Sequence, residues 1–96
     1  MTKADIVKEI ADKTGIGKIA VLASIESFLE VIINHMSQGE HIFLRGFGTF
    51  NVKKRAKKTG RNILKKTTII IPEHYIPIFK PVKAFSEMIK KSVLVN

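Results

Sequence analysis

The sequence predicts an α+β fold in which two N-terminal helices, an antiparallel sheet of three strands and a C-terminal helix share one core. Apolar residues repeat at helical spacing up to Gly39. They then alternate at strand spacing from Gly46 to Val52. A uniformly basic stretch follows from Lys53 to Lys66 and extends the sheet into a β-ribbon arm. A chain of 96 residues fits one domain and buries only roughly 60–65% of its unfolded surface, so a partner subunit would help to stabilise it.

The first two predicted elements are helices. Thr2, followed three positions later by Asp5, resembles a capping box, and the helix that begins there should end at Gly15. A second helix is predicted between Gly17 and Gln38. Its large apolar residues spread over an arc of about 140°, wider than the stripe of about 100° that one neighbour requires. Two explanations of this wide arc are equally consistent with the pattern of the helix. Either the helix packs between its own sheet and the first helix, or part of its apolar face contacts a second subunit.

A β-hairpin is predicted next. Ile42–Leu44 forms its first strand, and the glycines of Gly46-Phe47-Gly48 supply the backbone freedom of the turn. The second strand continues into the basic stretch without a breaker until Thr59-Gly60, and the β-branched run Thr67–Ile71 predicts the returning strand. We therefore predict an arm that runs out along residues 53–58 and back along residues 65–71.

Three prolines constrain the end of the chain. Pro72 and Pro77 cannot donate a backbone hydrogen bond, so the returning strand should lie at a sheet edge or contain a bulge. Pro81 is placed as the first residue of the last helix. The buried stripe of that helix should consist of Ala84, Phe85, Met88 and Ile89.

The net charge of +9 is concentrated in the second half of the chain. Residues 1–50 carry five Lys or Arg and six Asp or Glu, whereas residues 51–96 carry twelve and two. Such asymmetry favours phosphates, an acidic protein or an anionic membrane surface as partner. The absence of cysteine fits a reducing compartment, and the charged N-terminus and short apolar runs argue against a signal peptide or membrane span. We expect a cytoplasmic protein.

The sequence offers no pattern typical of an enzyme. His35, His41 and His74 lack the spacing of a metal site, and we interpret them as surface or packing residues. Gly46 and Gly48 lack the third glycine of a phosphate-binding loop. We expect no catalytic residue, no metal, no cofactor and no small-molecule substrate.

The basic stretch points to nucleic acid. Eight of the fourteen residues from Lys53 to Lys66 are Lys or Arg and none is acidic, so this segment should stand away from the body unless a polyanion neutralises it. A two-stranded ribbon can enter a DNA groove, and an apolar side chain at its tip can wedge between bases. An RNA-binding or ribosome-associated module is the alternative, but the arm has no aromatic residue for stacking. A membrane or acidic-protein partner is disfavoured because the charge lies on a predicted ribbon and not on an amphipathic helix.

At these residues the chain resembles the HU and integration host factor group of bacterial DNA-bending proteins. The resemblance is carried by the MTKADIV start, Gly39-Glu40, Leu44 to Phe50, Gly60-Arg61-Asn62, and Ile78 to Ala84. It implies an intertwined homodimer, or a heterodimer with a related chain, with a helical base and two arms that wrap and bend double-stranded DNA from its minor groove. It also implies a nucleoid location, and Phe47, Phe50 and Phe79 in the core of the dimer.

The resemblance assigns DNA contacts by position. Lys3, Lys80 and Lys83 would hold phosphates along the body, and Arg61 and Asn62 would reach the minor groove. The complete set of expected DNA-binding residues is Lys3, Lys53, Arg55, Lys57, Lys58, Arg61, Asn62, Ile63, Lys65, Lys66, Lys80 and Lys83.

The arm departs from the family pattern at Ile63 and at the pair Lys65-Lys66. The family usually has a proline wedge directly after Arg-Asn, where this chain has Ile63. Isoleucine can intercalate, so Ile63 is the expected wedge, and the alternative is that it only caps the ribbon. Lys65-Lys66 replaces a common Thr-Gly pair.

We expect residues 1–96 to form a single domain with three parts. Residues 1–40 would be the helical dimerisation part, residues 41–81 the sheet with its arm at about 53–71, and residues 82–96 the last helix and tail.

Overall fold

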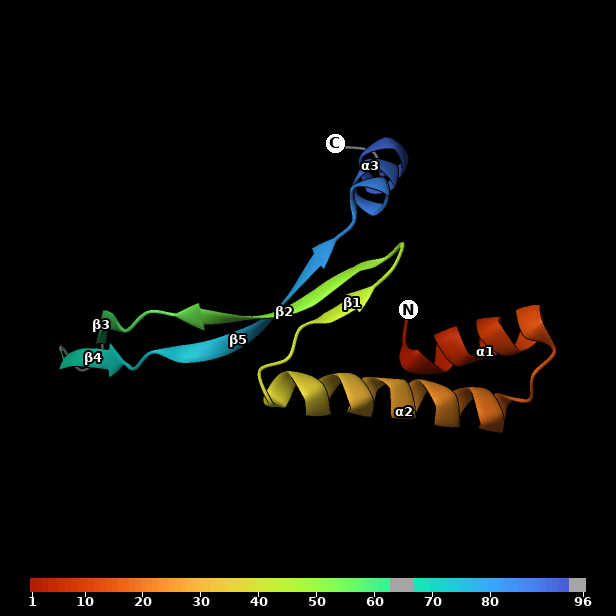
Figure 1. Ribbon diagram of the computed structural model, residues 1–96, viewed down its shortest axis with the longest axis horizontal. Helices are drawn as coiled ribbons and strands as arrows, with labels where there is room; N and C mark the ends of the chain where they lie inside the picture. The colour runs from red at the N-terminus through yellow and green to blue at the C-terminus, as the bar shows by residue number, and fades with distance from the viewer. Residues whose placement is uncertain (63–66, 94–96) are drawn as a thin grey trace.

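The computed structural model describes residues 1–62 and 67–93 (Figure 1). The predicted α+β class is confirmed. The elements in chain order are α1 (Lys3–Thr14), α2 (Lys18–Ser37), β1 (Ile42–Leu44), β2 (Gly48–Arg55), β3 (Lys58–Asn62), β4 (Thr67–Ile71), β5 (His74–Pro81) and α3 (Lys83–Ser92).

The caps of α1 are those that the sequence predicts. The Asp5 N–H donates to the Thr2 hydroxyl oxygen at 3.3 Å, and the Thr2 N–H donates to the Asp5 carboxylate at 2.8 Å, which completes the capping box. Both the Thr2 N–H and the Thr2 hydroxyl donate to this carboxylate, and they hold the pKa of Asp5 below its ordinary value of 3.8. Gly15 ends the helix with a φ of 77°. The α2 helix follows directly after Gly17.

The strands form two antiparallel sheets. In the first, β2 lies between β1 and β5, and the β2–β5 ladder runs from Gly48↔Pro81 to Arg55↔His74. The second consists of β3 and β4, which pair from Lys58↔Ile71 to Asn62↔Thr67. The ribbon is therefore interrupted at residues 56–57 and, on the opposite strand, at residues 72–73. The sequence placed no breaker before Thr59-Gly60. The interruption comes earlier because Pro72 has no N–H to offer the ladder.

The outer edge of β5 is occupied by prolines, as the sequence predicts for an edge strand. The Val82 N–H donates to the Phe47 carbonyl at 3.0 Å, which is towards β2. Because N–H groups alternate in direction along a strand, residues 77 and 81 are the positions whose N–H would point to the free edge. Pro77 and Pro81 therefore cost the ladder no hydrogen bond.

The last helix begins later than predicted. Pro81 is the final residue of β5, paired with Gly48, and the N-cap of α3 is Val82. The prediction that Pro81 begins the helix is therefore wrong. The strand continues because the pairing with Gly48 and the Val82 hydrogen bond keep the chain extended beyond the proline.

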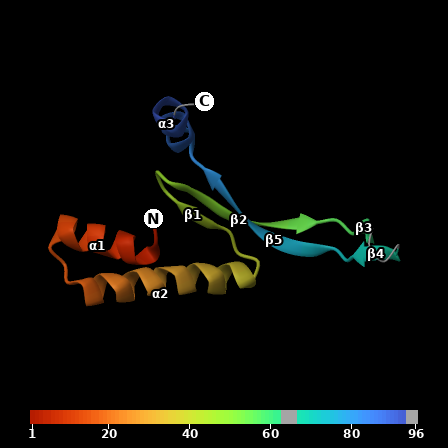
Figure 2. The same ribbon diagram turned by 180° about the vertical axis from the view of Figure 1, so that it is seen from behind.

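The predicted stripe of α3 is only partly covered. The ring of Phe85 packs against those of Phe47 and Phe79, with centroid separations of 5.3 and 6.1 Å. Met88 and Ile89, however, are 67% and 49% exposed. They were predicted to be buried, and they are not, because α3 lies at the far end of the sheet from the arm, away from α1 and α2 (Figures 1 and 2).

A single chain has almost no interior. Among the described residues only Val7, Val21 and Ile32 are buried hydrophobic side chains. The radius of gyration is 19.0 Å, whereas a compact chain of about 100 residues has a value of about 13 Å. On α2, Phe28 and Ile33 remain 48% and 64% exposed. The wide apolar arc of this helix is therefore not covered by its own chain.

Among the described helices, α2 is long and apolar enough to cross a membrane, judged by length and composition alone.

Candidate nucleic-acid interface

The register of the first sheet sorts its side chains onto two faces. Residues directly opposite each other in a ladder point to the same side, and successive residues along a strand point to opposite sides. One side carries Phe50 paired with Phe79, whose rings lie 4.9 Å apart. We name it the aromatic face. Residues of this face also line an open hollow of about 720 Å³ beside α2, together with Ile33 and Met36.

The opposite side is the basic face. It carries Thr49, Asn51, Lys53 and Arg55 of β2, His74, Ile76, Ile78 and Lys80 of β5, and Phe43 of β1. Three residues that the sequence predicts to bind DNA, Lys53, Arg55 and Lys80, thus share one surface. All three are exposed. Their charges can meet a polyanion together because the register places them on one side.

Lys54 shows how strictly the faces separate. It lies between Lys53 and Arg55 in the sequence but pairs with Tyr75 on the aromatic face. Its Nζ lies 3.4 Å from a carboxylate oxygen of Glu73, and both side chains are more than half exposed. The neighbouring cations of β2 therefore differ in direction, and Lys54 already has an acidic partner.

The remaining expected residues of the arm follow the interruption. Lys57 lies within it and Lys58 opens β3, and both are exposed. Arg61 and Asn62 are the last two residues of β3. Ile63, Lys65 and Lys66 lie outside the described residues, so the expected wedge has no structural description.

Two expected phosphate-binding residues come from other elements. Lys3 is the first residue of α1, in the helical part of the molecule, and Lys83 is the first residue of α3, beyond the end of β5. Neither belongs to the basic face of the sheet. Their assignment to phosphates stays a prediction from the resemblance.

Besides the three expected cations, the basic face carries residues that were not predicted to contact DNA, among them His74 and Phe43. His74 pairs with Arg55, and Phe43, which is 67% exposed, pairs with Thr49. The signal that identifies both is the strand register. It could not be used before the pairing of β1, β2 and β5 was known.

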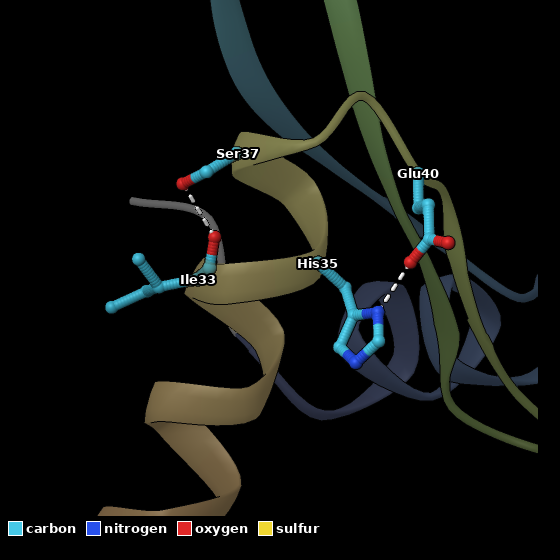
Figure 3. Close-up of polar contacts among 4 residues, drawn as sticks. All are labelled: Ile33, His35, Ser37 and Glu40. Atoms are coloured by element: carbon cyan, nitrogen blue, oxygen red, sulfur yellow. Dashed lines mark hydrogen bonds and ion pairs between the residues drawn. The ribbon is translucent and has the colours of Figure 1, made fainter.

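The three histidines occupy separate places. The Nδ1 of His35, at the end of α2, contacts a carboxylate oxygen of Glu40. In the same turn of the helix, the Ser37 hydroxyl donates to the Ile33 carbonyl at 2.7 Å (Figure 3). His41 lies 3.0 Å from the Asn51 side-chain oxygen, and His74 lies 3.0 Å from the Pro72 carbonyl oxygen. Within residues 1–62 and 67–93, no three His, Asp or Glu side chains gather as metal ligands.

Comparison with known proteins identifies the family. Residues 1–90 match the family described as bacterial DNA-binding protein. The chain belongs to this family. The resemblance indicated by the sequence motifs is thereby confirmed.

Relatives in the bacterial DNA-binding protein family match along almost their whole length. DNA-binding protein HU of Thermus thermophilus is 40% identical over 91 residues, which are 95% of this chain and 94% of that protein. Integration host factor subunit beta of Colwellia psychrerythraea is 36% identical over 94 residues, covering 97% and 99%. Among solved structures, an Anabaena HU–DNA cocrystal structure superposes with a TM-score of 0.88 at 32% identity and covers 93% of this chain and 97% of that one.

Proposed function

We propose that this protein is a dimeric architectural DNA-binding protein that binds duplex DNA through its phosphates and minor groove, bends it and compacts the chromosome. The observation that supports this most is the basic face, which places Lys53, Arg55 and Lys80 on one surface that leads into a basic arm. The similar Anabaena structure is a complex with DNA, which supports the same partner here.

The exposed apolar surface supports a dimer. Only three hydrophobic side chains are buried among the described residues, and the hollow beside α2 is large enough for several side chains of a partner. Burying this surface in a second copy, at about 25 cal/mol per Å², would supply the core that one chain lacks. A related chain could take the place of the second copy, as the name of the integration host factor subunit suggests for that relative.

A second subunit covers α2 better than a lipid bilayer would. Glu26 and Glu30 lie within the helix, and Asn34 and His35 follow in its last turns. Charged side chains inside a membrane span are costly, whereas at the side of a helix in a soluble dimer they can stay in water. We propose that the protein is cytoplasmic and associated with the bacterial nucleoid.

The sequence preference should be modest. The minor groove distinguishes A·T from G·C pairs but little else, so discrimination would come mainly from how easily a site deforms. We propose Ile63 as the wedge between base steps, and Lys3, Lys53, Arg55, Lys57, Lys58, Arg61, Asn62, Lys65, Lys66, Lys80 and Lys83 as the other DNA-binding residues. We further propose that residues 1–96 act as one domain and have a binding role without catalysis.

The experiment that tests this function measures affinity for a duplex as salt is varied. We expect the logarithm of the binding constant to fall linearly with the logarithm of the salt concentration, with a slope of about −0.9 per phosphate neutralised. Linear, nicked and four-way-junction DNA are compared with RNA at matched salt. Binding that does not change between low and physiological salt, or that favours RNA, would contradict the proposal.

A further inference from the structure

His74 lies on the basic face, among the cations expected to bind DNA phosphates. It is exposed, it opens β5 at the root of the arm, and it pairs with Arg55 on the basic face. Lys53, two residues from Arg55 on β2, points to the same side. A phosphate bound by these two cations would therefore lie beside the imidazole.

The hydrogen bond of His74 determines which ring nitrogen carries the proton. Its Nδ1 lies 3.0 Å from the Pro72 carbonyl oxygen, and a carbonyl oxygen can only accept. Nδ1 therefore carries the hydrogen. In a neutral imidazole the other nitrogen, Nε2, then has none, and it would present a lone pair to a phosphate oxygen. Protonation adds an N–H at Nε2 and turns the same atom into a charged donor.

The charged groups around His74 favour the binding of a phosphate by the protonated imidazole. Arg55 and Lys53 face it from β2, and Lys57 lies in the adjacent interruption of the arm. The acidic neighbour in the sequence is Glu73, and its carboxylate contacts Lys54. Lys54 pairs with Tyr75 and therefore points to the aromatic face, away from the side chain of His74. A protonated His74 would thus stand among cations, and a phosphate is the group that offsets their mutual repulsion.

We propose that His74 binds a DNA phosphate in its protonated form, so that the protein holds duplex DNA more tightly as the pH falls from 8 to 5.5. This inference rests on the proposed function. Histidine is the side chain that ordinarily changes charge in this range. Release of the phosphate and loss of the proton are then coupled, and DNA binding takes up protons.

The test is the affinity of the full-length protein for a linear duplex at pH 8 and pH 5.5, at constant ionic strength, by fluorescence anisotropy. We expect the wild type to bind about three- to tenfold more tightly at pH 5.5. His74→Gln should lose most of this difference, and His74→Lys should bind at pH 8 about as tightly as the wild type at pH 5.5. Melting curves of both variants check that the fold is kept.

His35→Gln serves as the control. It removes a side chain that contacts Glu40 at the end of α2, and neither residue belongs to the basic face. This variant should keep the pH dependence of the wild type. An unchanged pH dependence in His74→Gln, or its loss in His35→Gln, would overturn the inference. Failure of both the wild type and His74→Gln to bind duplex DNA at pH 8 and at pH 5.5 would instead refute the proposed function.

Discussion

Gly48 packs against Phe79 so closely that a Cβ at position 48 would lie 2.6 Å from the Cζ atom of that ring. The same Cβ would lie 2.6 Å from the carbonyl oxygen of Lys80, which belongs to the backbone and cannot turn away. The second glycine of the hairpin is thus required by the packing of β5 on β2 and not by its own backbone conformation.

Gly48→Ala should therefore lower the free energy of unfolding by about 1–3 kcal/mol, the usual cost of overpacking a tight site. Chemical denaturation followed by circular dichroism measures it. Gly17→Ser is the control, because a Cβ added at this position would meet no atom within 4 Å beyond its chain neighbours and serine is a favoured N-cap residue. Equal losses of stability in the two variants would argue against the close packing as the cause.

Lys53→Ala and Lys54→Ala form a matched pair on β2. Removing Lys53, on the basic face, should weaken DNA binding and make the salt slope shallower by about 0.9 for each phosphate that the variant no longer neutralises. Removing Lys54, which points to the aromatic face and contacts Glu73, should leave the slope almost unchanged. Titrations at several salt concentrations measure both slopes, and the reverse order would refute the assignment of the faces.

Ile33→Glu and Val31→Glu test the dimer. Both side chains are exposed in one chain, at 64% and 55%, but only Ile33 lies in the apolar stripe of α2 and lines the hollow. We expect Ile33→Glu to dissociate or unfold the protein, because an unpaired carboxylate would be buried against a partner. Val31→Glu should remain a dimer in sedimentation equilibrium. A dimeric, folded Ile33→Glu would place the interface elsewhere.

The cap of α1 predicts a specific acid response. The folded-state pKa of Asp5 is lowered by the N–H and hydroxyl of Thr2, so its contribution to stability is fully present above the unfolded value of 3.8 and is lost as the pH falls through the lower folded value. The difference in stability between wild type and Asp5→Asn should shrink in that acidic window. Melting temperatures measured from pH 2 to pH 6 show it, with Asp12→Asn at the other end of α1 as the control.

Ile63→Ala tests the wedge proposed from the sequence. If Ile63 intercalates, this substitution should reduce the bend of the DNA more than it reduces affinity, because the unstacking of bases and the binding of phosphates are separate interactions. Fluorescence energy transfer between the two DNA ends measures the bend. An unchanged angle would support the alternative in which Ile63 only caps the ribbon.

Local signals in the sequence predicted most of the fold. Thr2 with Asp5 marked the start of α1 and Gly15 its end, because caps depend on residues a few positions apart. The prediction that Pro81 begins α3 was wrong because it too relied on a local rule. A local rule places proline at the start of a helix, whereas here a distant residue, Gly48, holds it in a strand.

The sequence predicted which residues of the site are charged, but not on which face of the sheet each of them lies. Eight cations between residues 53 and 66 are evident in the sequence, yet Lys53 and Lys54 look equivalent there. Only the pairing of β2 with β5 separates them and brings His74 beside Arg55. The exposure of Met88 and Ile89 depends on what covers α3, and the amphipathic pattern of a helix does not identify its neighbour.

The two prolines of β5 have a consequence for how copies can crowd along one chromosome. An exposed strand edge normally invites annealing with the next molecule, which is the first step towards fibrils. Pro77 and Pro81 withhold two of the donors that an incoming strand would need. The outer edge of β5 is therefore a poor template for a strand of a neighbouring molecule on the same duplex.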